Sequence, residues 1–585
     1  MRAGDMTISV FYDGDCPFCS KYMSMIRLKE TLGEVKLVDL RVNSNVKDEL
    51  LSQGFNLDKG MVVDIDGRRV DGADAVNQLA LLSTPSNGFN RFNKMVMSSP
   101  LLAACLYPFL RAGRWLVLFF LGRAQISPDD EGTVARASIF GSMFALFSMF
   151  HFFNYAIEYG RFPPQLDIMI VLFAAILLFL NPRSPRFLFI LMAVSTISAI
   201  VQAPVSSNHT IVRNFVLLGY WMSFFYAMFR SLKWSDIFTN FTMAGQASLL
   251  VMYFFGVFHK INSDFLNPDV SCAVGLWEKM PWPLYLVDHP IMHYLAIYGT
   301  FAVETILVLM LFSKRFRHIA VVFGILFHLL LAMSSYAMYI SFTTLAISLH
   351  CLFLNEDSAK KIQSSQFMQA VRARVMNPLY LVLGVVLTLC MVIAGMMRQY
   401  SIVTLLMLPL VLPFCFAVMR YGASDKPLLS ISNRLPTTVI GVFLGGLFFL
   451  NCWMPYLGLK SAQAVNMFAN IRLEGGVSNH LIMNKPPKAF NYLEDVIIID
   501  SVEGSKALLY YELNNHKVGM IYYAFLNEME TNPDAVVSYT RGGEKFVDIT
   551  KAELKEDIET TLHPKWFRKW FHFKPAELEY VRPCF

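Results

Sequence analysis

Long apolar segments dominate the middle of the sequence and decide what kind of chain this is. Between residues 137 and 456 they recur in runs of about 17–25 residues, the length that an α-helix needs to cross a bilayer. Only 16% of the 585 residues are charged, whereas soluble domains average about 25%. The composition excludes a soluble enzyme, a disordered chain and a collagen-like fibre, and it predicts a polytopic membrane protein.

Eleven of these runs are candidate membrane-spanning helices. They lie near 137–157, 165–181, 187–205, 211–229, 238–258, 290–312, 317–334, 336–354, 378–397, 400–419 and 437–456. A further apolar run, 101–121, carries Arg111 and Arg114 near its middle. Each arginine would cost about 2.5–3.5 kcal/mol at the centre of a bilayer. We therefore expect residues 101–121 to form a helix that lies on the membrane surface.

The basic residues of the loops predict how the spans are oriented. With the N-terminus in the cytosol, the cytosolic loops carry 14 lysines and arginines. The loops on the other side carry five, which are Arg161, Arg213, Lys260, Lys279 and Arg398. This asymmetry follows the positive-inside rule. We expect an integral, multi-pass membrane protein with a cytosolic N-terminus and an extracytoplasmic C-terminus.

The ends of the chain regain ordinary charge, which predicts a soluble domain at each end. We divide the chain into 1–98, an α/β domain; 99–130, an interfacial amphipathic helix and linker; 131–456, an all-α membrane bundle; and 457–585, an extracytoplasmic domain. Short strands predicted at 495–501, 507–513 and 535–540 make this last domain β-rich. Aromatic and basic residues at 565–571 favour an interfacial helix. The net charge of +6 is too dilute to indicate nucleic acid as a partner.

The first domain has the strand and helix order of a small thioredoxin-like fold. Strands are predicted at 7–13, 35–40 and 61–65, and helices follow Cys16, near 45–54 and from Ala73. The turn Asp66-Gly67 follows the third strand. This order places the pair Cys16 and Cys19 where the first strand meets the first helix.

Cys16 and Cys19 form a Cys-x-x-Cys pair in a position typical of redox chemistry. A sulfur at a helix N-terminus is stabilised as a thiolate by the free N–H groups and the helix dipole. Cys19 is placed to resolve a mixed disulfide formed on Cys16. Asp13 and Asp15 are expected to oppose thiolate formation, because nearby negative charge raises a thiol pKa. A metal site or an inert pair are the alternatives, but zinc would need two more ligands near by.

The string Tyr-Asp-Gly-Asp-Cys-Pro-Phe-Cys at 12–19 resembles the signature of the DCC family of thiol-disulfide oxidoreductases. The resemblance covers about residues 6–122 and includes the run that begins at Val63 and the arginine-bearing helix at its end. It implies dithiol–disulfide exchange with Cys16 as nucleophile and Cys19 as resolving cysteine. Its partners would be a thiol electron donor or a protein disulfide substrate. Thioredoxins carry a cis-proline before the third strand, whereas this chain reads Lys59-Gly60-Met61, so their mode of substrate binding is not implied.

Ionisable residues in the membrane domain are the second set of candidates, because such residues are costly in lipid. The predicted topology brings Lys260, His259, His209 and His328 to the outer side at similar depth. Lys260 is suited to act as a base or to hold an anion, or it extends to the headgroups. Three histidines are a possible metal set, but we predict no metal. Glu304 is expected to be buried and either paired or protonated.

Several short strings resemble vitamin K-dependent γ-carboxylases and the related HTTM (horizontally transferred transmembrane) proteins. They are Gly245-Gln246, Tyr253-Phe254, His259-Lys260-Ile261-Asn262-Ser263-Asp264-Phe265, Ser207-Asn208-His209 and Phe327-His328. The resemblance, over roughly 130–480, implies a cavity for a quinone or hydroquinone in which Lys260 is the base and His209 assists. His259 and His328 would help to line it. His259 replaces a lysine of that family, and the long lumenal substrate-binding region has no counterpart here.

These patterns leave three hypotheses. The first is a membrane-anchored thiol-disulfide oxidoreductase fused to an HTTM-like membrane domain. The second is an enzyme that processes a quinone or lipid in the cavity of Lys260. The third is a scaffold or transporter without enzymatic activity. Membrane lipids are expected partners in all three, and a quinone is the one cofactor that a resemblance suggests.

Overall fold

The computed structural model describes most of the chain and divides it into two compact units. The described residues are 7–26, 35–86, 88–158, 165–203, 207–334, 339–423, 435–514 and 517–577. The first unit consists of Met1–Val134 and Tyr220–Phe241, and the second of Ala135–Gly219 and Thr242–Phe585. The long helices α9 (Asn208–Arg230) and α10 (Trp234–Phe258) contribute to both.

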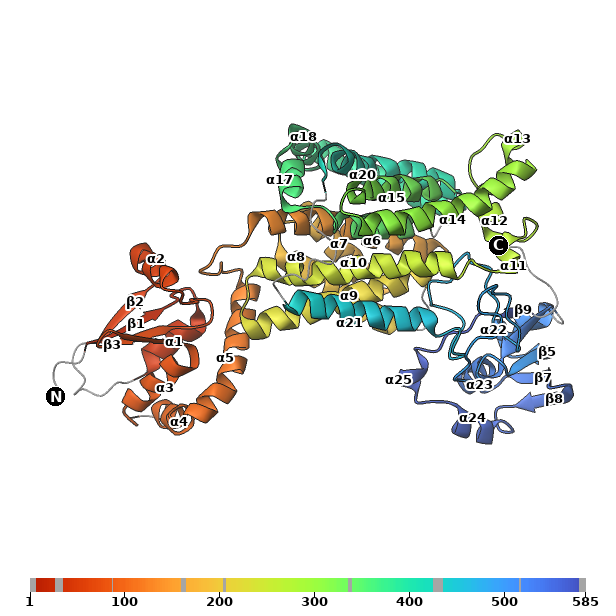
Figure 1. Cartoon of the computed structure of the whole chain (residues 1–585). Helices are drawn as coiled ribbons and strands as arrows, with labels where there is room; N and C mark the ends of the chain where they lie inside the picture. The colour runs from red at the N-terminus through yellow and green to blue at the C-terminus, as the bar shows by residue number, and fades with distance from the viewer. Residues whose placement is uncertain are drawn as a thin grey trace. The chain divides into compact units, whose positions relative to one another are not determined.

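A four-stranded sheet forms the centre of the first unit (Figure 1). Its strands are β1 (Ile8–Tyr12), β2 (Val35–Asp39), β3 (Val62–Ile65) and β4 (Arg68–Asp71), in the order β2-β1-β3-β4. β1 pairs in parallel with β2 and antiparallel with β3. Asp66 and Gly67, both with positive φ, make the tight turn from β3 to β4, as a two-residue hairpin requires. The three predicted strands and the turn are confirmed, and β4 is additional.

Helices cover both faces of this sheet because side chains alternate along each strand. Ile8, Val10 and Val63 pack against α1 (Pro17–Met25) and α3 (Gly72–Leu82). On the opposite face, Phe11 and Val62 pack with residues of α2 (Ser44–Ser52) and the segments around it. These two apolar layers fix the end of β1 and the start of α1, where the cysteines lie.

Two further helices complete the first unit. α4 (Gly88–Met97) and α5 (Pro100–Leu121) both pack on α3. Trp115 of α5 donates a hydrogen bond to the carbonyl of Leu232 at 2.8 Å, and its ring meets Trp234 at 4.7 Å between centroids. The predicted helix at 101–121 therefore exists, and one of its faces is an integral part of the α/β unit.

Each of the eleven predicted spans coincides with a helix. They are α6 (Glu131–Glu158), α7 (Leu166–Leu180), α8 (Pro185–Gln202), α9, α10, α14 (Pro290–Phe312), α15 (Arg317–Ala332), α16 (Tyr339–Cys351), α19 (Pro378–Met396), α20 (Tyr400–Tyr421) and α21 (Leu435–Trp453). In the described part of the chain, nine helices are long and apolar enough to cross a membrane, α5 among them. α7, α15 and α16 are shorter apolar helices.

The outer faces of these helices show that lipid is their solvent. On α14 the side chain of Leu309 is 64% exposed, and on α19 that of Val382 is 61% exposed. Contiguous apolar surface of this kind is rare on soluble monomers. The protein is therefore a multi-pass membrane protein. Five shorter helices connect the spans: α11 (Ser263–Leu266), α12 (Cys272–Glu278), α13 (Leu284–Val287), α17 (Glu356–Ser364) and α18 (Gln366–Val375).

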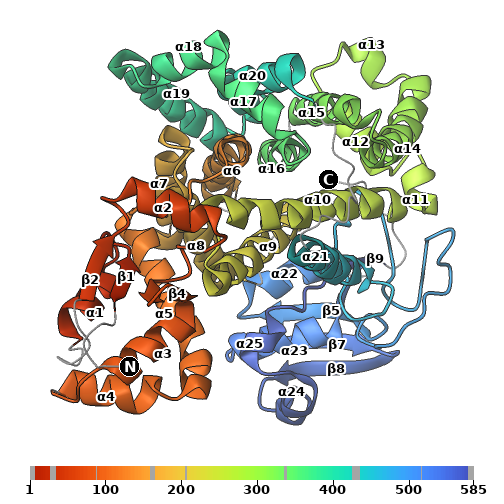
Figure 2. The same ribbon diagram turned by 60° about the vertical axis from the view of Figure 1, so that its left-hand side comes forward.

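The chain ends in a five-stranded sheet, in which β5, β7 and β8 lie side by side (Figures 1 and 2). The strands are β5 (Val496–Glu503), β6 (Val518–Ile521), β7 (Val536–Arg541), β8 (Glu544–Thr550) and β9 (Ala576–Glu577), and the helices are α22 (Lys506–Leu513), α23 (Tyr522–Thr531), α24 (Lys555–Thr561) and α25 (Lys565–Arg568). The strands predicted at 495–501 and 535–540 are confirmed.

Two local predictions for this region need correction. Residues 507–513 form helix α22 rather than a strand, because Ser505 caps the Leu508 N–H and Leu508 is fully buried. The helix predicted at 565–571 is only the single turn α25. Phe571 leaves that helix and stacks on Tyr523 in the domain core, so only part of the aromatic run remains exposed.

Candidate functional site

Cys16 is the N-cap residue of α1. Its Sγ accepts a hydrogen bond from the Cys19 backbone N–H at 3.3 Å, and Pro17 opens the helix without needing a donor. The preceding turn requires Gly14, since a Cβ there would lie 1.9 Å from Asp39 Oδ2. The sequence from Gly14 to Cys19 thus folds so that the first sulfur meets the free N–H groups of the helix.

Asp13, just before this turn, is buried between two arginines. Arg41 Nε lies 2.7 Å from its Oδ1, and an Arg114 terminal nitrogen lies 2.8 Å from its Oδ2. Arg114 comes from α5 and also donates to the Asp58 carbonyl. The Asp58 carboxylate in turn accepts from the Ile126 N–H at 2.8 Å. The negative charge beside the cysteines is therefore compensated, and the same contacts fasten α5 to the cysteine loop.

These contacts set the ionisation of the pair. The pKa of Cys16 falls from 9.0 to about 6, chiefly because its thiolate accepts a hydrogen bond from Cys19. The positive charge of Arg114 lowers this pKa further, whereas burial raises it. The same hydrogen bond and burial raise the pKa of Cys19. The expected effect of Asp13 is found at Cys19, whose pKa its charge helps to raise, whereas the pKa of Cys16 is lowered.

The two sulfurs differ in access. The Cys16 side chain is fully buried, and Leu118 of α5 and Trp234 pack against the pair. Cys19 is 6% exposed and lines an apolar pocket of about 430 Å³ between α1, α4 and α5. The pocket therefore adjoins the dithiol on the Cys19 side.

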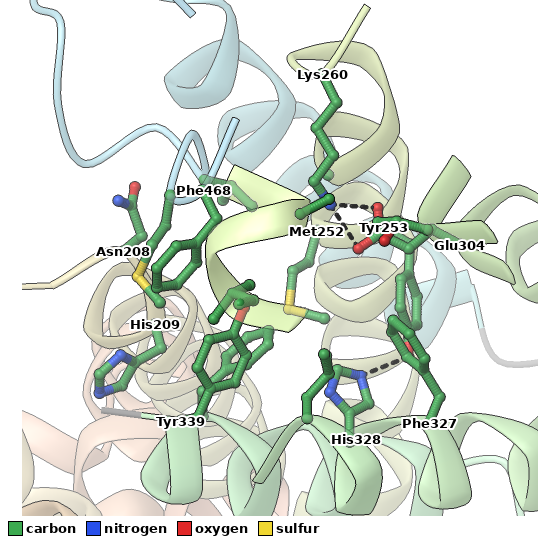
Figure 3. Close-up of a pocket in the computed structure, with 18 of the residues that line it drawn as sticks. Asn208, His209, Met252, Tyr253, Lys260, Glu304, Phe327, His328, Tyr339 and Phe468 are labelled. Carbon is green, nitrogen blue, oxygen red and sulfur yellow. Dashed lines mark hydrogen bonds and ion pairs between the residues drawn. The ribbon is translucent and has the colours of Figure 1, made fainter. Parts of the chain in front are cut away.

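A second group of polar residues surrounds a small cavity in the other unit (Figure 3). Lys260 Nζ lies 2.6 Å from both carboxylate oxygens of Glu304, which confirms that Glu304 is paired. Both side chains are largely buried. An ion pair inside a membrane domain is costly and marks a functional candidate.

The predicted histidines do not all meet at this cavity. His328 and His209 line it, and His328 Nε2 lies 2.7 Å from the Tyr253 hydroxyl. In Figure 3, His209 lies apart from the Lys260–Glu304 pair. His259 is not among the lining residues; its ring nitrogens bond the Tyr456 hydroxyl and the Ala464 carbonyl at 2.8 and 2.9 Å. Among the described residues, no group of three or more metal-binding side chains is gathered.

The segment after α21 covers the Lys260 loop. Asn479 donates to the Asp264 carboxylate at 2.7 Å, and the Ser263 N–H donates to the Asn479 carbonyl at 3.1 Å. Val465 and Phe468 line the cavity and both have positive φ, at 60° and 56°. For a β-branched residue such as Val465 this conformation is strained. Strain of this kind is concentrated at functional sites.

The cavity itself measures about 90 Å³, below the roughly 300 Å³ at which pockets for drug-sized ligands begin. It has room for a few water molecules or a very small ligand. A quinone ring with its substituents would require the walls to move. Of the two pockets described here, the one beside Cys19 is the larger by volume.

Several residues of both sites were not singled out from the sequence. From the sequence, Arg114 was used only to argue that residues 101–121 do not span the membrane. An arginine in an apolar helix also indicates a buried acidic partner. His350, whose Nε2 lies 3.2 Å from the Tyr253 hydroxyl, and His151, 3.4 Å from His209, lie in apolar helices with no local motif. Their proximity depends on helix packing.

Comparison with known proteins identifies the domain that contains the first site. Residues 10–118 match the family model described as DCC1-like thiol-disulfide oxidoreductase. No curated protein and no solved structure matches the chain. The first unit thus contains a DCC1-like thiol-disulfide oxidoreductase domain, with Cys16, Cys19 and Arg114 inside the matched range. The match ends before the apolar helices of the second unit.

The ionisation of Cys16 gives a direct prediction. The ultraviolet absorbance of the thiolate, taken as wild type minus Cys16→Ser in the reduced full-length protein, should rise with pH around a midpoint of about 6. A folded-state pKa below the ordinary value of 9.0 also means that the thiolate stabilises the reduced fold. This contribution is complete above pH 9.0, declines as the pH falls below that value and is lost once the pH has fallen through about 6.

Arg114→Met should move this midpoint upward, because it removes the positive charge next to the thiolate. Arg41→Met is the matched control, since it also removes one partner of Asp13 but leaves Arg114 in place. A wild-type midpoint near 9, or equal midpoints in the two variants, would contradict the account of the site.

Proposed function

We propose that this protein is a membrane-anchored thiol-disulfide oxidoreductase whose reacting pair is Cys16 and Cys19. The Cys16 thiolate attacks a disulfide, forms a mixed disulfide and releases one thiolate. Cys19, after losing its proton, attacks Cys16, which forms the Cys16–Cys19 disulfide and releases the second thiolate. A thiol donor then reduces the pair again. The observation that carries the proposal is the Cys16 thiolate at the start of α1, bonded by Cys19 and facing Arg114.

We further propose that the DCC1-like domain lies in the cytosol and the C-terminal domain outside it. The distribution of basic loop residues supports this orientation. Cys272 supports it too, because it is disulfide-bonded whereas the seven other described cysteines are free. Structural disulfides persist in oxidising compartments and are rare in the cytosol. Cys16 and Cys19 are among the free thiols.

The exchange reaction tests the main proposal. Full-length protein in detergent should reduce a small water-soluble disulfide, with a low-molecular-weight dithiol as donor. Cys16→Ser should lower the rate at least about 100-fold, since it removes the nucleophile. Cys19→Ser should trap the mixed disulfide on Cys16, visible by mass spectrometry.

Cys105→Ser is the control, because Cys105 is a free, exposed thiol in the same unit. Its rate should equal that of the wild type. Equal rates for Cys16→Ser and Cys105→Ser would remove the basis of the proposal.

A second candidate function concerns the cavity of Lys260. The buried Lys260–Glu304 pair, the Tyr253–His328 contact and the strained segment around Val465 favour a ligand or reaction site there. The resemblance to vitamin K-dependent γ-carboxylases and HTTM proteins suggests a quinone or a lipid, with Lys260 as base and His209 near the ligand. In its paired state Lys260 already donates to Glu304. Base chemistry would therefore begin with the release of that pair.

Variants that break the Lys260–Glu304 ion pair should show how much the pair contributes to stability. Lys260→Met leaves the Glu304 carboxylate buried without its partner, which should cost about 3–5 kcal/mol of unfolding free energy. The double variant Lys260→Met/Glu304→Leu should recover most of this loss. Denaturant titration in mild detergent provides the measurement.

The folded double variant then tests the ligand. Wild-type protein should release a quinone or lipid on denaturation, identified by mass spectrometry, and the double variant should not. The same content of that molecule in both proteins would exclude a ligand held by the pair.

A further inference from the structure

The pocket beside Cys19 has walls suited to a flat, apolar molecule. Aromatic rings from three helices line it, namely Tyr22 of α1, Phe92 of α4 and Tyr107 of α5. Its volume of about 430 Å³ lies within the range of roughly 300–1,000 Å³ found for small-molecule sites. Rings of this kind stack on planar ligands. The dithiol therefore opens on a preformed apolar site.

One polar group in this wall lacks a partner. The Asn93 side chain is 4% exposed, and its Oδ1 lies 3.5 Å from the Tyr22 hydroxyl. Its Nδ2 is buried and has no hydrogen-bond partner among the described residues. Leaving a buried donor unsatisfied costs about 1–3 kcal/mol. A carbonyl oxygen of a ligand in the pocket would satisfy it.

The mouth of the pocket is apolar and exposed. Four lining residues belong to the exposed large apolar side chains of the domain: Phe18, Phe92, Phe109 and Leu110, each at least 53% exposed. On α5 the exposed apolar surface continues through Leu101 and Leu106. Such a surface favours lipid over water. The mouth of the pocket therefore favours an apolar molecule.

The same wall is poorly suited to a polypeptide. An extended peptide is bound mainly through hydrogen bonds to free backbone groups. The Lys59 carbonyl in this wall already accepts a hydrogen bond from the Tyr107 hydroxyl at 2.8 Å. At Gly60 even a Cβ would lie 1.8 Å from that hydroxyl. Together with the burial of Cys16, this favours a compact ligand over a protein disulfide.

We propose that the pocket binds a lipid-soluble quinone and that the Cys16–Cys19 dithiol reduces it. The Cys16 thiolate and the Cys19 S–H group together give up two electrons and form one S–S bond. The two electrons pass to the quinone with the Cys19 proton and one proton from water, which gives the hydroquinone. Cys19 is the sulfur that meets the ring, and Asn93 donates to one carbonyl. This proposal rests on the proposed function, because the Cys16–Cys19 disulfide left by the quinone must be reduced by the same thiol donor as in disulfide exchange.

The test uses reduced full-length protein, freed of reductant, and a fully substituted benzoquinone with a decyl chain, to whose ring thiols do not add. Hydroquinone formation is followed by absorbance, and the Cys16–Cys19 disulfide by mass spectrometry. We expect one hydroquinone per disulfide formed. Cys16→Ser should form none. Asn93→Leu should raise the KM for the quinone about 2- to 10-fold, the value of one neutral hydrogen bond.

Gly113→Phe blocks the pocket without touching the cysteines. Gly113 lines the pocket, and a Cβ there would meet no atom within 4 Å, so the ring has space to enter. Because the pair is reached through the same pocket, this variant should lose quinone reduction and should also slow reduction of a small water-soluble disulfide. Gly299→Phe, at an equally open position of α14, is the control and should behave as wild type.

The outcomes separate the two proposals. If wild type reduces the water-soluble disulfide but not the quinone, the quinone proposal is overturned and the oxidoreductase stands. Equal quinone reduction by wild type and Gly113→Phe overturns the assignment of the pocket. If wild type reduces neither compound, both proposals fail.

Discussion

The buried contact between Arg114 and Asp13 joins helix α5 to the cysteine loop in the first unit of this protein. An arginine inside an apolar helix is costly unless a carboxylate meets it, and Asp13 provides that carboxylate at 2.8 Å. Asp13 in turn would destabilise a neighbouring thiolate if it were not paired. Because each charge needs the other, α5 and the cysteine loop form one structure. Helix α5 therefore forms one wall of the cysteine site.

That wall has consequences for the chemistry. It supplies Leu118, which packs against the cysteines, and Tyr107, whose hydroxyl donates a hydrogen bond to the Lys59 carbonyl. The positive charge of Arg114 favours the thiolate of Cys16. The result is a buried sulfur with a lowered pKa next to an apolar pocket. The two candidate sites thus have different cavities: the larger adjoins the dithiol, and the smaller contains the Lys260–Glu304 pair.

Much of the fold follows from local sequence patterns. The strand–turn–helix around Cys16, the two later strands of the α/β domain and the apolar helices of the membrane region all have clear periodicity. Residues 507–513 mislead because their apolar run fits a strand as well as a short helix, and only the cap at Ser505 and the burial of Leu508 decide. Local pattern is ambiguous over so few residues.

The sites were less predictable because they depend on distant contacts. Cys16 and Cys19 are separated by only two residues, so a redox motif is visible in the sequence. Arg114 follows Asp13 by 101 residues, and no spacing rule connects them. His259 and Lys260 are neighbours in sequence, yet one bonds Tyr456 and the other Glu304. Which side chain enters a cavity is determined by the rotation of the chain after α10, which composition does not reveal.

The central claim is that the redox pair is reached through an apolar pocket, and the most direct measurement compares two thiol reagents. Reduced protein in lipid vesicles is labelled with an alkyl maleimide and with a charged maleimide, each corrected for its rate with glutathione. Peptide mass spectrometry reports labelling of Cys16 and Cys19. The account predicts at least about tenfold faster labelling by the alkyl reagent, as expected where an apolar site excludes a charge. Equal corrected rates, or faster labelling by the charged reagent, would contradict it.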